Sequence, residues 1–120
     1  MASSDSVEQH STELLKGTIQ TIILKLLTDN SRMYGYEITQ RVRELSGESI
    51  IFTEGALYPT LHRLEAEGLL RTETVTTGGR IRKYYSLTRQ GKKVASYKLE
   101  EFVAFVRTMT QVLNIKTDLT

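Results

Sequence analysis

The sequence predicts a mainly α-helical domain with one β-hairpin, an α+β fold in which three helices precede the hairpin and one long helix follows it. Apolar residues recur at helical spacing in four segments, and a Gly-Gly pair separates two segments with strand-like composition and alternation. The chain has 120 residues, of which 39% are hydrophobic and 25% are charged. These values are typical of a single globular domain.

Two amphipathic helices are predicted at the start, over 13–28 and 35–46. The first ends at Asp29-Asn30-Ser31 and the second at Ser46-Gly47-Glu48, because these residue types favour turns. One side of each helix is expected to face the core: Leu15, Ile19, Ile22 and Leu26 in the first, and Ile38, Val42 and Leu45 in the second.

The third helix is predicted over 54–67, with Thr53 as its N-cap and Gly68 at its C-terminal end. Pro59, the only proline of the chain, lies within about the first turn and a half, where few amide hydrogen bonds exist to be lost. It either fixes the start of the helix or offers a compact apolar ring to a binding partner. The core side of this helix carries Leu57, Leu61 and Leu64.

A β-hairpin is predicted next, with strands over 69–75 and 81–87 and a tight turn at Gly78-Gly79. Alternation places Arg80, Arg82 and Tyr84 on one side of the second strand and Ile81, Lys83 and Tyr85 on the other. The sequence leaves open which side faces inward.

A long helix is predicted from its N-cap, Thr88, to about Asn114. Apolar residues in it repeat at alternating spacings of four and three, as in a heptad seam. Such a seam favours a homodimer, and the alternative is that the helix folds back on its own core. The seam consists of Ala95, Leu99, Phe102, Val106, Met109 and Leu113, and the expected dimer contacts are Leu99, Phe102, Val103, Val106, Met109 and Leu113.

Three helices followed by a hairpin are typical of a winged helix-turn-helix, whose third helix enters the DNA major groove while the hairpin, or wing, reaches the backbone or minor groove. The outward side of the third helix would carry Ala56, Pro59, Thr60, Arg63 and Glu67. Arg63 can bond a guanine through two donors, and Thr60 can contact a phosphate or a base edge. The expected organisation is a flexible leader over 1–12, a DNA-binding domain over 13–87, a dimerisation helix over 88–115 and a tail over 116–120.

The basic residues are concentrated near the hairpin. The net charge is only +2, yet the segment from Arg71 to Lys93 holds seven basic residues and one acidic residue. Arg80, Arg82 and Lys83 place three cations within four residues of the wing. Such cations bind DNA phosphates without reading the base sequence. A basic face exposed only to solvent is the alternative.

Three stretches together resemble the PadR-type transcriptional regulators: GYEI (35–38), ALYPTLHRLEAEGLL (56–70) and GGRIRKYYSLTRQG (78–91). The resemblance covers about 14–113 and is closest to the short-tailed, multidrug-sensing branch. It implies a homodimeric bacterial regulator, usually a repressor, that binds an inverted-repeat operator in double-stranded DNA. Ile81 departs from the family, since many relatives carry a basic residue there. By this resemblance the DNA surface includes Tyr36, Thr53, Ala56, Tyr58, Pro59, Thr60 and Arg63, with Arg80, Arg82 and Lys83 in the wing; Tyr36 could equally be a packing residue.

The resemblance also implies a small aromatic or hydrophobic effector, because some relatives bind planar compounds between their terminal helices. Phe102 falls at the comparable place, with Phe105 nearby. The chain has no tryptophan to provide a strong stacking surface. At helical spacing the two phenylalanines could equally be core residues.

Other classes of function are disfavoured by composition. Cysteine is absent and only two histidines occur, His10 and His62, so a metal site, a cofactor or an enzyme is not expected. No apolar run is long enough to span a membrane and the first residues do not resemble a signal peptide, so we expect a cytoplasmic protein. A winged-helix module that binds proteins instead of DNA remains the alternative function.

Overall fold

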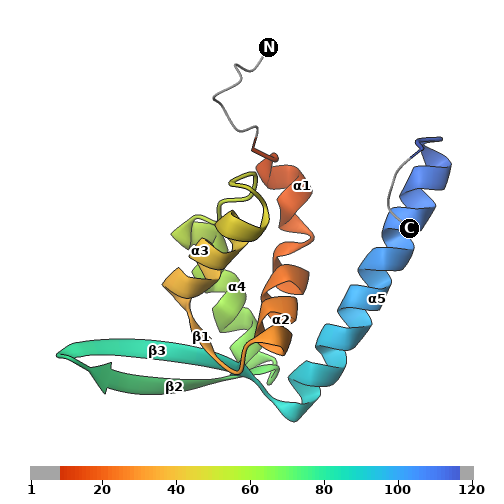
Figure 1. Cartoon of the computed structure of the whole chain (residues 1–120). Helices are drawn as coiled ribbons and strands as arrows, with labels where there is room; N and C mark the ends of the chain where they lie inside the picture. Colours follow the sequence, from red (N-terminus) through yellow and green to blue (C-terminus); the bar gives the residue numbers. More distant parts are fainter. Residues whose placement is uncertain (1–8, 117–120) are drawn as a thin grey trace.

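The computed structural model describes residues 9–116 and has the predicted fold class, mainly helical with a small antiparallel sheet (Figure 1). Residues 1–8 of the expected leader and 117–120 of the expected tail lie outside the described residues. In chain order the elements are α1 (Thr12–Lys16), α2 (Ile19–Asp29), β1 (Met33–Tyr34), α3 (Gly35–Leu45), α4 (Glu54–Ala66), β2 (Leu70–Thr77), β3 (Arg80–Leu87) and α5 (Arg89–Val112).

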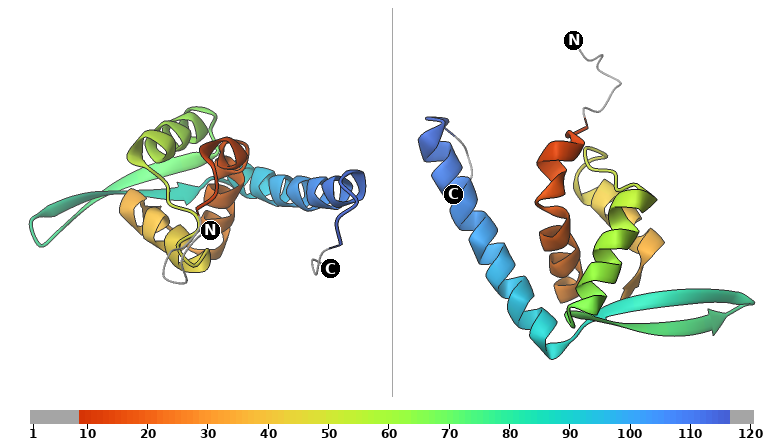
Figure 2. Two further views of the ribbon diagram at one scale, coloured as in Figure 1. Left: turned by 90° about the horizontal axis from the view of Figure 1, so that it is seen from above. Right: turned by 180° about the vertical axis from the view of Figure 1, so that it is seen from behind.

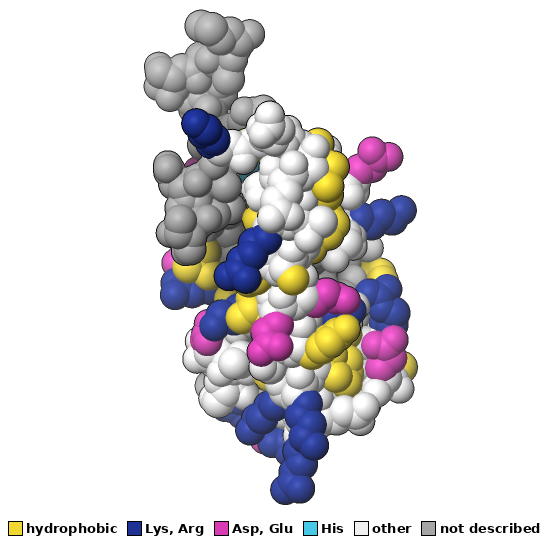
Figure 3. Space-filling model, turned by 90° about the vertical axis from the view of Figure 1, so that its right-hand side faces the viewer, with side chains coloured by type: hydrophobic (Ala, Val, Ile, Leu, Met, Phe, Trp, Pro, Cys, Tyr) yellow, Lys and Arg dark blue, Asp and Glu magenta, His cyan; other side chains and the backbone are white. Residues whose placement is uncertain are grey.

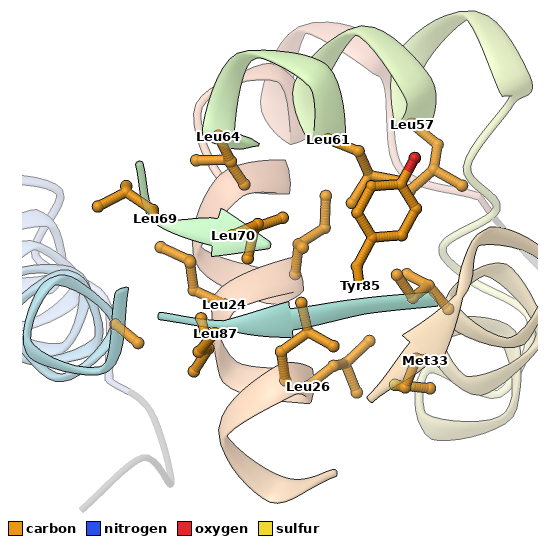
Figure 4. Packing of buried hydrophobic residues seen from close by; sticks show 14 of the residues in the cluster. Leu24, Leu26, Met33, Leu57, Leu61, Leu64, Leu69, Leu70, Tyr85 and Leu87 are labelled. Atoms are coloured by element: carbon orange, nitrogen blue, oxygen red, sulfur yellow. The ribbon is translucent and has the colours of Figure 1, made fainter. Parts of the chain in front are cut away.

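The core lies between α2, α3, α4 and the base of the sheet. Leu57 and Leu61 of α4 lie beside Tyr85 of β3, which is almost completely buried, while Leu64 lies nearer to Leu69 and Leu70 (Figure 4). The opposite wall comes from α2, where Ile23, Leu24, Leu26 and Leu27 are buried. Burial of such side chains supplies the main driving force for folding.

The sheet has the order β1-β3-β2 and is antiparallel throughout. The hairpin agrees with the prediction, and left-handed glycines Gly78 and Gly79 form its turn. The sequence analysis missed β1, because two residues are too few to show alternation and a helix follows at once. Met33 and Tyr34 pair with Tyr85 and Tyr84, so this short strand supports only the base of the hairpin.

The single helix predicted over 13–28 is wrong, because Gly17 and Thr18 divide it into α1 and α2. Gly17 caps α1 through its amide, and the Thr18 hydroxyl donates to the Leu15 carbonyl at 3.0 Å. The start of α1 also lies inside the leader predicted to be flexible. Here Ser11 accepts a hydrogen bond from the amide of Leu14, and the His10 amide donates to the Ser49 carbonyl.

The prediction that Leu45 faces the core is also wrong, since its side chain is exposed. Leu45 is the last residue of α3, beyond the buried positions Ile38 and Val42. Spacing alone cannot show that the core ends before the helix does.

The last helix leaves the wing through a tight junction. The Thr88 hydroxyl donates to the Gly68 carbonyl at 2.7 Å and accepts from the Gly91 amide at 3.0 Å, while the Thr88 amide donates to the Leu69 carbonyl. From there α5 runs beside α2, and it moves away from α1 towards its C-terminal end (Figures 1 and 2). The wing and α5 project from opposite sides of the helical body (Figure 2). In the part of the chain that the structure describes, no helix is long and apolar enough to cross a membrane.

Gly91 is expected to be essential at this junction, because a Cβ atom there would collide with the Leu69 carbonyl oxygen and approach its carbonyl carbon to 3.0 Å. Replacing Gly91 with Ala should lower the free energy of unfolding by about 1–3 kcal/mol, the usual cost of overpacking. Gly17→Ala is the control, since nothing lies within 4 Å of its Cβ position and its φ is −84°. Urea unfolding of both variants tests this. Equal stability of the two would contradict it.

Candidate nucleic-acid interface

Local capping explains how α4 begins and why it tolerates a proline. The Thr53 hydroxyl accepts a hydrogen bond from the Ala56 amide at 3.2 Å. Pro59 has no amide, so the Gly55 carbonyl lacks its usual helical partner. Gly55 is exposed, and water can therefore bond to that carbonyl. The proline consequently costs less here than it would in a buried helix interior.

The outward side of α4 differs from the prediction at one residue. Pro59 and Arg63 are exposed and Ala56 is half-buried, as an interface requires, but Thr60 is only 7% exposed. The Thr60 hydroxyl donates to the Ala56 carbonyl at 2.9 Å. Its expected place on the outward side of the helix is therefore wrong. Thr60 stands three residues after Leu57 and four before Leu64, which puts it on the core side of the helix.

A groove of about 310 Å³ lies between the start of α3, the side of α4 and the wing. Ile81 is 73% exposed and Tyr36 is 63% exposed at its lining, so Tyr36 is not a buried packing residue. The groove is open to solvent along the wing. Its lining residues are Tyr34, Gly35, Tyr36, Tyr58, His62, Ile81, Arg82, Lys83 and Tyr85.

The side of β3 that faces inward carries Ile81, Lys83 and Tyr85, which settles the alternative left open by the sequence. Tyr85 is buried under α4, and burial raises the pKa of its phenol, with smaller contributions from the Glu65 carboxylate and from Tyr58. The Lys83 ammonium lies 3.8 Å from a carboxylate oxygen of Glu65 on α4. Glu65 also accepts a hydrogen bond from the Thr72 hydroxyl at 3.2 Å. Glu65 thus links the recognition helix to both strands of the wing.

Arginines occupy the other side of the wing. Arg80 is exposed near the turn, and the Arg82 guanidinium lies 4.5 Å from the centroid of the Tyr34 ring, which places it at the groove. Arg82 and Lys83 therefore reach one groove from opposite sides of the same strand. The groove thus has cations on its wing side and Tyr58 and His62 of α4 on the other.

Tyr58 depends on a glycine opposite it. A Cβ atom on Gly35 would collide with the Tyr58 hydroxyl and lie 2.8 Å from the ring carbon Cζ. Tyr58 also packs partly against the core. A glycine at the first residue of α3 therefore leaves room for Tyr58 of α4 to lie against α3 and line the groove. The motif GYEI carried this glycine, but its purpose depends on a residue 23 positions later in the chain.

The predicted DNA-binding residues did not include His62 or Tyr34, although both line the groove. His62 lies beside Tyr58, with ring centroids 6.5 Å apart. Tyr34 was not singled out, because its neighbours in the groove come from distant parts of the chain. Spacing along α4 could have identified His62, which follows Tyr58 by one helical turn. No local signal identifies Tyr34.

Comparison with known proteins agrees with this geometry. The model of the "Transcriptional regulator PadR-like family" matches residues 23–96. The chain belongs to the PadR-like family. It is 40% identical to the transcriptional regulator Rv3488 of Mycobacterium tuberculosis over 80 residues, covering 67% of this chain and 71% of that protein.

Solved structures of PadR-like and related regulators have the same fold. A transcriptional regulator from Clostridium thermocellum has a TM-score of 0.77 and 30% identity, with 85% of this chain and 96% of that chain covered. A PadR family regulator from Clostridium difficile has a TM-score of 0.70 and 34% identity, covering 81% and 99%. The family resemblance and the winged helix-turn-helix prediction are thus confirmed.

Membership in the PadR-like family identifies the chain as a transcriptional regulator and implies DNA binding. The family is not enzymatic, which confirms the prediction that the protein is no enzyme. Within residues 9–116, no group of three or more histidine, aspartate or glutamate side chains is arranged to hold a metal ion.

The contact between Gly35 and Tyr58 can be tested by substitution. Gly35→Ala should lower the free energy of unfolding by about 1–3 kcal/mol, because the added methyl group overlaps the Tyr58 ring and hydroxyl. Tyr58→Phe removes the hydroxyl, so the double variant should be less destabilised than the sum of the two single variants. Thermal and urea unfolding of the two single variants, the double variant and the wild-type protein complete this double-mutant cycle. Strict additivity would show that Tyr58 is not what excludes the methyl group.

Proposed function

We propose that the protein is a sequence-specific repressor that binds an inverted-repeat operator as a homodimer, through α4 and the wing of each subunit. The observation that carries the proposal is the groove itself, which Tyr58 and His62 of α4 line on one side and Arg82 and Lys83 of the wing line on the other. A DNA strand entering this groove would meet cations on one side and a recognition helix on the other. As a regulator of chromosomal genes, the protein would act in the cytoplasm.

The exposed side of α4 is proposed to read bases. Arg63 is exposed and forms no ion pair with any residue that the structure describes, so its guanidinium is free for a guanine edge. Pro59 presents an exposed apolar ring suited to a thymine methyl group, and half-buried Ala56 allows close approach. Thr53 lies exposed at the helix start, where amides and helix dipole favour a phosphate.

The wing, together with Tyr36 and Tyr58 of the groove lining, is proposed to bind the DNA backbone. Arg80, Arg82 and Lys83 would neutralise phosphates, and Lys83 would exchange its contact with Glu65 for one of them. That contact spans 3.8 Å between partly exposed groups, so it contributes little stability that DNA binding must replace. The exposed Tyr36 and half-buried Tyr58 offer hydroxyl groups along the same path.

The proposal of a homodimer is supported by α5. Ala95 is buried against the subunit's own core, but the following seam is only partly covered. In this single chain Leu99, Phe102, Val103 and Leu113 are exposed, while Val106 and Met109 are half-buried. Viewed from the side of α5, apolar side chains lie among charged ones along the helix, and basic side chains gather at the lower end (Figure 3). Covering the seam would gain roughly 25 cal/mol per Å² of apolar surface before the cost of association.

We also propose that an aromatic or hydrophobic effector binds between the α5 helices of the two subunits and releases the protein from DNA. Phe102 is 37% exposed and Phe105 is 57% exposed, so neither ring is a core residue of the single subunit. A planar compound held between two copies of α5 could stack on these rings. It would change the separation of the two α4 helices, which must match successive turns of the duplex.

If Arg63 reads bases and Arg82 binds phosphates, replacing each of them should affect DNA binding in a different way. Arg63→Ala should reduce the preference for the selected operator over altered operators, because a bidentate base contact contributes about 1–3 kcal/mol of discrimination. Arg82→Ala should weaken binding to all duplexes alike and reduce the salt slope of log K by about 0.9. Fluorescence anisotropy with operators selected from a random pool, at several salt concentrations, measures both. Equal losses on every duplex for both variants would contradict the assignment.

The dimer can be tested with a pair of substitutions on α5. Val106→Asp places a charge in the seam and should shift the protein to monomer at about micromolar concentration, because an unpaired buried charge is costly. Thr108→Asp is the matched control, since Thr108 is exposed two residues away and outside the seam. Sedimentation velocity gives the oligomeric state, and circular dichroism checks that both variants are folded. A monomeric wild-type protein at this concentration would refute the proposed assembly.

A further inference from the structure

Four side chains form a continuous stack across the outer side of the sheet, which we name the arginine–tyrosine stack: Arg32, Tyr84, Tyr34 and Arg82. The Arg32 guanidinium lies 4.3 Å from the centroid of the Tyr84 ring. Tyr84 meets Tyr34 edge to face, with ring centroids 5.4 Å apart and an interplanar angle of 85°. The Arg82 guanidinium in turn lies 4.5 Å from the centroid of Tyr34.

The stack is fixed at its far end by an ion pair. Arg32 donates to a carboxylate oxygen of Glu73 at 2.6 Å, and Glu73 pairs with Tyr84 in the register of β2 and β3. Glu73 belongs to β2, Tyr84 and Arg82 to β3, and Tyr34 to β1. Together with Glu73, the stack therefore joins all three strands through side chains, in addition to their backbone hydrogen bonds.

The position of the stack gives it mechanical importance. Met33 and Tyr34 are the only residues of β1, so β3 loses this partner beyond Tyr84 and continues to the wing tip paired with β2 alone. An isolated two-stranded hairpin is marginally stable in water. The strand β1 lies where the hairpin leaves the body of the protein (Figure 1), and the stack lies at the same place because Tyr34 belongs to β1.

Arg82 ends the stack at the groove. Both Arg82 and Tyr34 line the groove, and Arg82 forms no ion pair with a carboxylate among the described residues. Lys83, its neighbour, is occupied with Glu65. A guanidinium stacked on an aromatic face keeps the donors in its plane available for hydrogen bonds. The Arg82 guanidinium is therefore held in place by stacking, while its hydrogen-bond donors remain available.

We propose that Arg32, Tyr84 and Tyr34 are positioning residues, which hold the Arg82 guanidinium at the groove so that it can bind a backbone phosphate with little loss of side-chain freedom. This inference rests on the proposed DNA-binding role of the groove. Its physical basis is preorganisation, because a flexible arginine that must be ordered on binding loses side-chain entropy that a stacked arginine has already lost.

A first experiment tests the stack without DNA. In the full-length protein, the Arg82 Hδ proton resonances should be shifted upfield by the Tyr34 ring current. The shift should persist in Tyr34→Phe, which keeps the ring, and disappear in Tyr34→Leu. Unshifted resonances in the wild-type protein would overturn the proposal, whatever the protein binds.

A second experiment measures the coupling to DNA binding. The probe is a duplex that the wild-type protein selects from a random pool, and the variants are Tyr34→Leu, Tyr34→Phe, Arg82→Ala and the Tyr34→Leu/Arg82→Ala double variant. Tyr34→Leu should weaken binding by about 3- to 10-fold, as expected for loss of a cation–π contact. Tyr34→Phe should change affinity by less than about twofold, because the ring remains. In the Arg82→Ala background, Tyr34→Leu should have almost no further effect.

The outcomes separate this inference from the proposed function. If Tyr34→Leu weakens binding equally with and without Arg82, Tyr34 supports only the fold and the inference is wrong, although DNA binding stands. If no duplex is selected, the proposed function and this inference fail together. Tyr84→Leu provides a second variant should Tyr34→Leu not fold, as judged by circular dichroism. It should show the same dependence on Arg82, because Tyr84 holds the Tyr34 ring from its edge.

Discussion

The burial of Tyr85 against one side of α4 is the contact on which the rest of the structure depends. Tyr85 is paired with Met33 on one side and with Thr72 on the other, so the centre of the sheet is fixed wherever this ring is fixed. Leu57 and Leu61 of α4 pack around it (Figure 4). One apolar contact therefore sets the angle between the recognition helix and the wing, and with it the groove between them.

The charges of the interface are organised around that apolar contact. Residues alternate along β3, so Lys83 shares the side of Tyr85 while Arg82 lies on the opposite side, where it stacks on Tyr34. Glu65 accepts from Thr72 and holds Lys83, which spaces the wing from α4 without closing the groove. The groove thus carries two cations whose positions are set by different partners. Net charge alone, only +2, would not indicate this arrangement.

The second constraint is the junction between the wing and α5. Thr88 caps α5 while its hydroxyl bonds the Gly68 carbonyl, and Gly91 lets the helix approach the backbone of Leu69. Since Gly68 comes two residues after the end of α4, this junction links α4, the wing and α5 within a few residues. A change in how α5 packs would reach α4 through this short path, which is the physical route by which an effector at α5 could act on DNA binding.

The sequence by itself determined α4, the hairpin and α5, because their signals are local: leucines at helical spacing, the caps Thr53 and Thr88, and the Gly78-Gly79 turn. It also placed Arg63 on the outward side of α4 and three cations in the wing, because helical spacing and the hairpin signal are local as well. Only the tertiary structure decided which side of β3 faces inward, that β1 exists, that Thr60 is buried, and that Arg82 stacks on Tyr34. Each of these depends on contacts between residues far apart in the chain, and local periodicity carries no information about which distant surface a side chain will meet.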